Sequence, residues 1–312
     1  MIAILKYCGL SGFIAALYYR LLILLYTNNP SKRFIKKSIY NYQLYLDTCD
    51  PGISRTLLLF GKRELEHKLM LEKVLKPGMT VLDIGANIGY YTMMESRLVG
   101  LEGKIIAIEP SPDNIALLKR NVELNHCKNV MVFEGAISDR KGERDFFMAK
   151  SSNLNTFHNM GSGVHDLTGK TLTVKVMTVV DLMKDIGKPD LIRMDVEGHE
   201  VEVINGMLPA IQRGELSPMI IFETHITRYS KNHNMEASLR GLFDAGYFVQ
   251  YLASNAESGT NKIQAKGYKG LEYVKTDFVH RVIFESVKAE DAIDLICHVG
   301  GVRTVLLAKS SK

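Results

Sequence analysis

Short apolar runs alternate with longer amphipathic segments along the middle of the chain. We interpret the apolar runs as strands, at Met79–Ile84, Lys104–Ile108, Val130–Phe133, Leu191–Met194 and Met219–Phe222. The segments Tyr90–Val99 and Asp113–Asn125, which separate the first three runs, have the pattern of helices. This alternation predicts an α/β fold with a mostly parallel sheet and helices on both faces.

The chain before residue 77 has a different pattern. Residues 1–30 form a hydrophobic N-terminal segment, and residues 31–76 mix aromatic, aliphatic and charged positions. The run 63–75 has apolar residues at helical spacing and is ended by Lys76-Pro77-Gly78. We therefore expect a helical lead-in over 31–76, the main domain over 77–285 and a C-terminal extension over 286–312.

The hydrophobic segment has features of a membrane anchor. Its uninterrupted apolar stretch, Tyr7 to Tyr19, is too short to cross a bilayer of about 30 Å, but Lys6 and Arg20 at its ends can snorkel. A basic cluster follows, at Lys32, Arg33, Lys36 and Lys37. The positive-inside rule then predicts that the following domain lies on the cytoplasmic face of a membrane, in contact with it through residues 2–26. A helix packed on the protein body is the alternative, and the lack of an A-x-A site disfavours a cleaved signal.

Charge and cysteine content narrow the function classes. The net charge of +5 arises from residues 1–46, which carry six basic and no acidic side chains, so the rest of the chain has a charge of −1. That balance argues against a nucleic-acid partner. The four cysteines form no CxxC pair, which argues against a structural zinc site and a disulfide framework and favours a reducing compartment.

A glycine turn follows the first strand of the main domain. It reads Gly85-Ala86-Asn87-Ile88-Gly89, with Asn87 where a dinucleotide fold has the glycine that lets a pyrophosphate approach. A side chain there is compatible with a cofactor that lacks a pyrophosphate, such as S-adenosylmethionine. Glu109 lies 24 residues after Gly85, at the end of the next strand, where a carboxylate can accept hydrogen bonds from both ribose hydroxyls. Asp83 and Glu134 lie at the ends of their strands, at the same edge of the sheet, and are also expected to contact the cofactor, as are Gly85, Asn87 and Gly89 of the turn.

Several segments together resemble the FkbM-type methyltransferases. They are Val81–Thr92, Ala107–Pro112, Glu134–Ser138 with Lys141-Gly142, Thr178–Leu182 and, most specifically, Asp190–Glu200. The resemblance covers roughly residues 77–252. It implies a Rossmann-like methyltransferase sheet with an antiparallel strand near the C-terminal part. It also implies S-adenosylmethionine as cofactor, with Glu134 and Ala136 near the adenine, and methyl transfer to a hydroxyl of a sugar, lipid or secondary metabolite. Family members often have Lys where this chain has Arg193.

Four side chains are candidates for catalysis. Transfer from a sulfonium needs alignment of donor and acceptor and removal of a proton from the alcohol. Asp195, at the end of an apolar strand, is the first candidate for this base, with an N-cap as its alternative role. Glu197, Glu223 and His225 are further candidates. The spacing of Asp195, Glu197 and His225 matches no metal motif, so we expect no metal, and we expect His199 at the surface or as a helix cap.

Other functions stay open at this point. A nicotinamide-dependent oxidoreductase would share the sheet but should have glycine at position 87, and a noncatalytic protein of the same fold would bind the cofactor without transferring methyl groups. N-methylation and nucleic-acid methylation are minor alternatives. Two polar segments, Ser151–Lys170 and Ser254–Gly270, have the composition of loops that could cover the acceptor.

Overall fold

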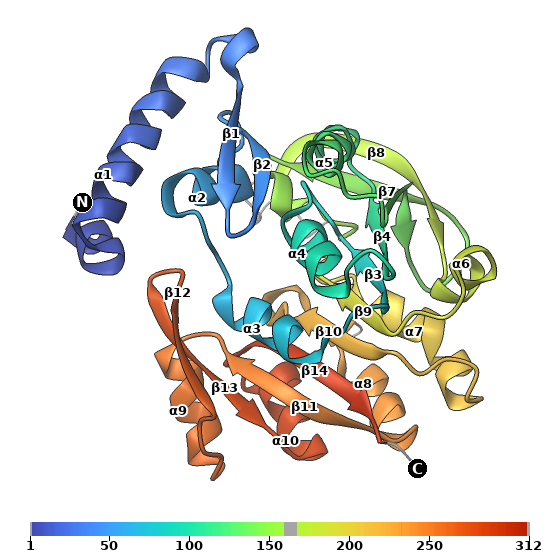
Figure 1. Ribbon diagram of the computed structural model, residues 1–312. Helices are drawn as coiled ribbons and strands as arrows, with labels where there is room; N and C mark the ends of the chain where they lie inside the picture. The colour runs from blue at the N-terminus through green and yellow to red at the C-terminus, as the bar shows by residue number, and fades with distance from the viewer. Residues whose placement is uncertain (1, 159–166, 232, 311–312) are drawn as a thin grey trace.

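The protein is an α/β structure built around one large mixed sheet (Figure 1). The computed structural model describes residues 2–158, 167–231 and 233–310. The main sheet has the strand order β12-β13-β11-β14-β10-β9-β3-β4-β5. Its parallel strands are β3 (Thr80–Ile84), β4 (Lys104–Glu109), β5 (Val130–Glu134), β9 (Leu191–Met194) and β10 (Met219–Glu223). Its antiparallel part comprises β11 (Tyr247–Ser254), β12 (Glu272–Thr276), β13 (Val279–Glu285) and β14 (Val302–Lys309).

Helices cover both faces of this sheet. Because side chains alternate along a strand, Leu82 of β3 lies in the core on one face and Val81 in the core on the other. The first core includes residues of α6 (Val179–Ile186), α7 (Glu200–Gln212), α8 (Glu236–Asp244), α9 (Glu257–Ala265) and α10 (Ala289–Ile293). The second includes residues of α2 (Ile53–Phe60), α3 (Leu65–Val74), α4 (Tyr90–Val99) and α5 (Pro112–Leu124). The expected Rossmann-like α/β class is confirmed. The antiparallel part of the sheet has four strands, β11 to β14, where one was expected.

The lead-in over residues 31–76 is only partly helical. It contains the hairpin of β1 (Phe34–Ile39) and β2 (Tyr42–Asp47) before α2 and α3. The side chain of Asn121 on α5 accepts a hydrogen bond from the backbone N–H of Tyr45 at 2.7 Å, and Asn125 accepts one from Gln43 at 2.9 Å. These bonds hold β2 against α5. The two segments are about 80 residues apart in the chain, so the local sequence pattern could not predict this contact.

The predicted C-terminal extension is part of the main sheet. Its strand β14 lies between β10 and β11 and pairs antiparallel with both. Leu306 and Leu307 of β14 are fully buried, one in each hydrophobic core. The boundary at residue 285 therefore does not separate an appendage from the main domain.

The two predicted polar loops differ in the structure. Within Ser254–Gly270 the chain forms α9, because Ile263 is buried against the sheet while its neighbours face solvent, so the loop expectation is wrong there. Within Ser151–Lys170 the structure describes a 3₁₀ turn at Ser152–Leu154 and the start of β8 (Leu167–Met177); residues 159–166 lie outside the described residues. A small sheet of β6 (Ala136–Ile137), β7 (Gly142–Ala149) and β8 carries this turn.

The N-terminal helix α1 (Ile2–Tyr26) projects from the body beside α2 and the β1–β2 hairpin (Figure 1). Its window Gly9–Tyr26 has a mean hydropathy of 1.6 and is 11% buried, so by length and composition it could cross a membrane. Ile23 belongs to the second core, and the ring of Tyr7 lies 4.3 Å from that of Phe278. The helix thus contacts the body at a few positions and leaves most of its apolar surface exposed.

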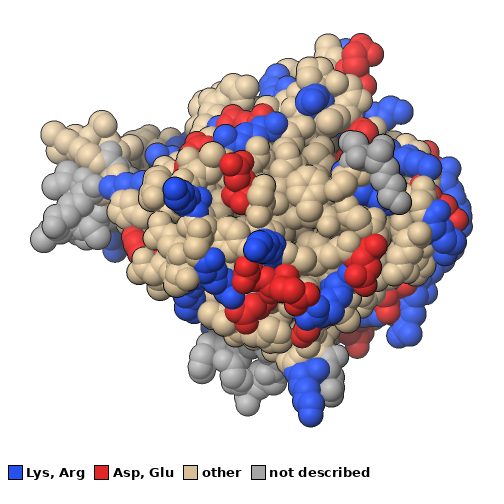
Figure 2. Space-filling view, turned by 90° about the horizontal axis from the view of Figure 1, so that it is seen from below, with Lys and Arg blue, Asp and Glu red and all other residues tan. Residues whose placement is uncertain are grey.

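Acidic and basic side chains are interspersed on the surface. Figure 2 shows Lys and Arg next to Asp and Glu over much of the face seen from below. Ion pairs of this kind link α8 to α10, where Arg240 bonds Glu290 at 2.8 Å, and place Lys266 3.1 Å from Asp291. Such mutual neutralisation differs from the continuous basic surface that a nucleic-acid partner requires.

Candidate active site

The glycine turn between β3 and α4 brings the backbone close to the end of β9. Gly85 has φ of 80°, and a Cβ there would lie 2.3 Å from the carbonyl oxygen of Asp195. Gly89 has φ of 92°, and its Cβ would lie 2.8 Å from Leu118 Cδ1. Both positions therefore require glycine for conformation and for space. The turn and Asp195 are held in direct contact at the carboxyl edge of the sheet.

Asn87 adopts the left-handed conformation within this turn, with φ of 51°. Asparagine tolerates this region because its short side chain bonds the local backbone, here accepting from the N–H of Ile88 at 2.8 Å. Its side-chain amide also donates to the carbonyl of Ser152 at 3.1 Å. Asn87 thus connects the turn to the 3₁₀ turn at Ser152–Leu154.

Glu109 is buried at the end of β4. Its carboxylate accepts hydrogen bonds from the backbone N–H of Asn87 at 2.9 Å, that of Ser111 at 3.0 Å and the side-chain amide of Asn114 at 3.1 Å. Burial nevertheless raises the pKa of Glu109 to about 7, with the three donors opposing the shift. A buried carboxylate in that state gains from further hydrogen-bond donors, which two ribose hydroxyls would supply.

A pocket lies between Glu109, the glycine turn and Asp195. Gly85, Asn87 and Glu109 line it, and its apolar lining includes Ile84, Ile108, Ala136, Ile137, Phe146 and Phe157. It therefore combines a buried acceptor for hydroxyl groups with an apolar slot for a flat ring. These features fit a nucleoside, and the turn at Ser152–Leu154 forms part of the wall.

Two of the expected cofactor residues lie elsewhere. Glu134 is more than half exposed and forms an ion pair with Lys119 at 2.5 Å, because β5 is the edge strand and its terminal side chain reaches solvent. Asp83 is fully buried beneath the sheet edge and accepts a hydrogen bond from Thr92 at 2.5 Å. The structure thus places Asp83 under the glycine turn and Glu134 on the outer surface.

Arg193 is the buried cation that pairs with Asp83. The two residues are register partners on β9 and β3, and Arg193 Nη1 lies 3.0 Å from Asp83 Oδ1. The same guanidinium donates to the carbonyl of Gly85 at 3.2 Å and to Asp195 Oδ2 at 3.3 Å, and it lies 4.2 Å from the ring of Tyr91. Arg193 therefore links the core, the glycine turn and the candidate base through one rigid group.

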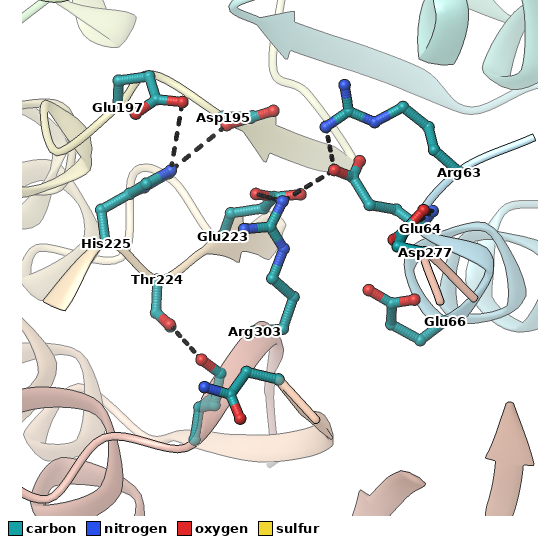
Figure 3. A network of polar contacts seen from close by, with 12 residues as sticks. Arg63, Glu64, Glu66, Asp195, Glu197, Glu223, Thr224, His225, Asp277 and Arg303 are labelled. Atoms are coloured by element: carbon teal, nitrogen blue, oxygen red, sulfur yellow. Dashed lines mark hydrogen bonds and ion pairs between the residues drawn. The ribbon is translucent and has the colours of Figure 1, made fainter. Parts of the chain in front are cut away.

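Asp195, Glu197 and His225 converge at the rim of the pocket (Figure 3). His225 Nε2 lies 3.7 Å from Asp195 and 3.8 Å from Glu197, and its Nδ1 lies 3.1 Å from the buried carboxylate of Glu200. Burial lowers the pKa of His225, but Glu200, Glu197 and Asp195 outweigh it and raise the value to about 10. His225 is consequently a cation at neutral pH, held against three carboxylates.

Glu223 lies one step deeper, in a second charge network (Figure 3). Its Oε2 is 2.7 Å from Arg303 Nη2, which is also 2.8 Å from Glu64 Oε1. Burial, together with Asp195 and Glu64, raises the pKa of Glu223 well above its usual range. Burial raises the pKa of Glu64 too, but Arg63 and Arg303 hold it well below its usual range. The network therefore keeps one of its carboxylic acids ionised and favours a proton on the other.

The four catalytic candidates lie close together but differ in their access to the pocket. Asp195 and Glu197 line the pocket, whereas Glu223 and His225 are not part of its lining, and His225 contacts Asp195. Burial raises the pKa of Glu197. The ligand atoms of Asp195, Glu197 and His225 also lie within 4.8 Å of one another, a spacing at which they could hold a divalent cation. The proton on His225 supplies positive charge at the same point.

Some residues of the site have no obvious sequence signal. Arg303 comes from β14, about 80 residues after Glu223, and no motif marks it. His199, expected at the surface or as a cap, is fully buried and makes no capping bond to α7. Its ring instead lies 4.5 Å from that of Phe157.

Comparison with known proteins places the site in context. The model of the family described as "Methyltransferase FkbM domain" matches residues 83–249. Hexuronic acid methyltransferase AglP of Haloferax volcanii is 27% identical over 148 residues, 46% of this chain and 56% of that protein. Protein-L-isoaspartate O-methyltransferase 1 of Arabidopsis thaliana is 38% identical over 74 residues, 24% of this chain and 32% of that protein. The chain thus spans between about a third and just over half the length of these curated relatives.

Solved structures of methyltransferases also align with the chain. Methyltransferase FkbM from Methylobacillus flagellatus KT aligns with 14% identity and a TM-score of 0.36, over 89% of this chain and 62% of that one.

Arg193→Met should strongly destabilise the protein, because it leaves Asp83 buried without its cation. Removal of one partner from a buried ion pair typically costs about 3–5 kcal/mol of the free energy of unfolding. Arg193→Lys should be milder, since lysine keeps the charge with fewer hydrogen bonds. Urea unfolding followed by circular dichroism measures the change. The matched control is Arg213→Met, which breaks the exposed pair with Glu215 and should leave the midpoint nearly unchanged. Equal midpoints for the two methionine variants would contradict the role of Arg193.

Proposed function

The chain belongs to the FkbM methyltransferase family, and on this premise we propose that it methylates a hydroxyl group of a glycan. It is an S-adenosylmethionine-dependent methyltransferase, and that cofactor supplies an electrophilic methyl group on its sulfonium. The observation that carries the proposal of O-methylation is the position of Asp195, a carboxylate between the nucleoside pocket and a second cleft.

The cofactor pocket has the chemistry of an adenosyl site. Glu109 would accept hydrogen bonds from the ribose hydroxyls, and the apolar slot at Ala136 and Ile137 would hold the adenine, with Phe146 and Phe157 completing its walls. Gly85, which packs against Asp195, lines the same pocket. A donor bound in this way would have its reactive end near the candidate base.

Asp195 is the best placed of the four candidates to receive the proton. Arg193 Nη2 and His225 Nε2 lie 3.3 Å and 3.7 Å from its carboxylate, and these contacts hold the side chain in place at the pocket. Burial raises the pKa of Glu223 and also that of Glu197, which favours the protonated form of both side chains. In the proposed step, the acceptor oxygen forms a bond to the methyl carbon, the carbon–sulfur bond breaks, and the hydroxyl proton passes to Asp195.

A second cleft adjoins this point. Arg63, Glu64 and Asn153 line both the cleft and the small pocket that contains Asp195, so the two spaces share a wall. The far wall has the aromatic rings of Tyr7, Phe60 and Phe278. Its polar walls include Lys62, Glu64, Asp277, Arg281 and Arg303, and both arginines pair with carboxylates of the protein. Aromatic faces that can stack on a sugar ring support a sugar as acceptor. The similarity to a hexuronic acid methyltransferase supports an acidic sugar in particular.

The helix α1 borders this cleft and supports a membrane-bound acceptor. Tyr7 of α1 contributes to the aromatic wall, while Leu10, Ile14, Leu21 and Leu24 along the same helix are exposed. If the exposed face enters a bilayer, the cleft opens near the membrane surface. We therefore propose that the glycan is carried by a lipid and that the protein works on the cytoplasmic face.

Methyl transfer to purified glycans tests the proposal as a whole. The protein is incubated with S-adenosylmethionine and glycans with and without uronic acids, and the products are weighed by mass spectrometry. A gain of one methyl group, about 14 Da, on a sugar hydroxyl supports O-methylation. Binding of cofactor with no transfer to any acceptor would favour a noncatalytic protein, and binding of a nicotinamide cofactor instead would contradict the proposal.

Glu109→Ala should weaken the binding of S-adenosylmethionine by about 1–3 kcal/mol, through loss of the ribose hydrogen bonds. In the unmodified protein, the pKa of about 7 means that binding to the ionised carboxylate releases a proton at lower pH. Affinity should therefore rise with pH up to about 7 and then level off. Calorimetry of wild type, Glu109→Gln and the exposed control Glu123→Gln measures this. A pH dependence that survives in Glu109→Gln would contradict the assignment.

Asp195→Asn should lower the turnover number by about 10²–10⁴-fold, because it keeps the size of the side chain and removes its basicity. Cofactor affinity and unfolding midpoint should change little. The control is Asp185→Asn on the exposed surface of α6. Normal turnover with lowered stability would mean that Asp195 has a structural role, and parallel tests of Glu223→Gln and His225→Gln would follow.

Deletion of residues 1–30 should move the protein from the membrane fraction to the soluble fraction, because it removes the exposed apolar helix. Fractionation of cells that express the full chain and the shortened chain measures the distribution. Methyl transfer to a soluble acceptor fragment should persist in the shortened chain. Full recovery of both chains in the soluble fraction would contradict a membrane role and leave α1 as a packed helix.

A further inference from the structure

A group of histidines surrounds Glu202 on the side of α7 away from Asp195. His158 follows β7, His199 and Glu202 stand at the start of α7, and His233 lies between β10 and α8. The nearest carboxylate oxygen of Glu202 is 3.8 Å from His158 Nε2, 3.3 Å from His199 Nδ1 and 3.1 Å from His233 Nε2. Three separate segments thus direct imidazole nitrogens at one carboxylate.

Two buried nitrogens of this cluster lack hydrogen-bond partners. Neither His199 Nδ1 nor His158 Nε2 has one among the described residues, although both are buried atoms. His199 is fully buried, so water cannot satisfy its Nδ1 from bulk solvent. The contact of this atom with Glu202 at 3.3 Å does not have hydrogen-bond geometry. A buried polar atom in this position requires an explanation.

The hydrogen bonds on the other side of His199 indicate which nitrogen carries its proton. Ser138 donates its hydroxyl proton to Asp139 at 3.1 Å, so Ser138 Oγ is left to accept from His199 Nε2, also at 3.1 Å. A proton on Nε2 leaves a lone pair on Nδ1, facing the carboxylate of Glu202. Two electron-rich atoms at this distance are stabilised by a cation between them. Orientation of a ligand histidine by a bond to its other nitrogen is a common feature of metal sites.

We propose that His158 Nε2, His199 Nδ1 and the carboxylate of Glu202 bind a divalent transition-metal ion of the zinc class. Each residue offers a ligand atom within 4.8 Å of the others, and the two ring nitrogens lie 3.8 Å and 3.3 Å from the Glu202 carboxylate, separations that two bonds of about 2.0–2.2 Å to one ion can span. Two imidazoles and a carboxylate favour zinc over magnesium or calcium, which prefer oxygen ligands. His233 contacts Glu202 and orients it from outside.

The cluster at Asp195, Glu197 and His225 is the weaker candidate for such an ion. There a single imidazole lies among three carboxylates, those of Asp195, Glu197 and Glu200. Around Glu202, two imidazole nitrogens without a hydrogen-bond partner face one carboxylate, the mixed nitrogen and oxygen ligand set that zinc prefers.

The ion would join segments that form the cofactor pocket. Phe157, next to His158, packs on the ring of His199, and both residues line the pocket. A bond from the ion to His158 and His199 fixes this wall to the start of α7. Glu202 and His158 keep 16% and 20% of their side-chain surfaces exposed, which gives the ion a path to the site. This inference does not depend on the proposed acceptor.

Zinc titration of the full-length protein tests the site. After treatment with EDTA, calorimetry with zinc chloride should show one tight site, and saturation should raise the melting temperature. His233→Ala should weaken zinc binding by about 10–100-fold, the typical effect of losing a residue that orients a metal ligand. His158→Ala and Glu202→Gln, which each remove a ligand, should weaken it further. The exposed control His280→Ala should bind zinc like the wild type.

Cobalt(II) provides an independent readout. Bound to the same site, it should show visible d–d bands without the thiolate charge-transfer band that cysteine ligands produce. These bands should disappear in His158→Ala and persist in His225→Gln. The proposal is overturned if the wild type binds no zinc, or if zinc and cobalt binding are lost in His225→Gln and retained in His158→Ala. A variant with a wild-type circular dichroism spectrum excludes misfolding as the cause.

Discussion

The buried guanidinium of Arg193 is the interaction on which the active site depends. Its strand, β9, lies between β10 and β3 in the parallel part of the sheet. Burial of this charge is tolerated because Asp83 and Asp195 neutralise it and Tyr91 packs against it. Its bond to the carbonyl of Gly85 fixes the turn that faces the cofactor. One residue therefore sets the distance between the nucleoside pocket and Asp195, and burial leaves it little freedom to move.

Charge differs systematically across the site. On the cofactor side, Glu109 is a nearly isolated carboxylate whose pKa is raised by burial to about 7. On the acceptor side, carboxylates alternate with Arg63, Arg303 and the cationic His225. The first arrangement suits hydrogen bonds to neutral hydroxyls, and the second surrounds the carboxylate of Asp195 with cationic side chains.

Local sequence patterns predicted the strands and helices of the parallel half and the position of Glu109, because these depend on periodicity and on residues next to strand ends. The pairing of Asp83 with Arg193 depends on which strands are neighbours in the sheet, and 110 residues separate the two in the chain. The same limit applies to β14, whose apolar run contains no signal that it inserts between β10 and β11. The helix α9 was missed because Ile263 is the one large apolar side chain among its buried residues, in an otherwise polar segment. Glu134 was expected at the cofactor because it ends a strand. That strand, β5, is at the edge of the sheet, and the side chain of Glu134 extends into solvent.

A crystal structure of the protein with S-adenosylhomocysteine would test the central claim most directly. The account predicts the ribose hydroxyls within hydrogen-bond distance of Glu109, the adenine against Ala136 and Ile137, and the sulfur atom directed toward Asp195 and the cleft beyond it. A ligand bound elsewhere, or one bound here with its sulfur directed away from Asp195, would contradict the account.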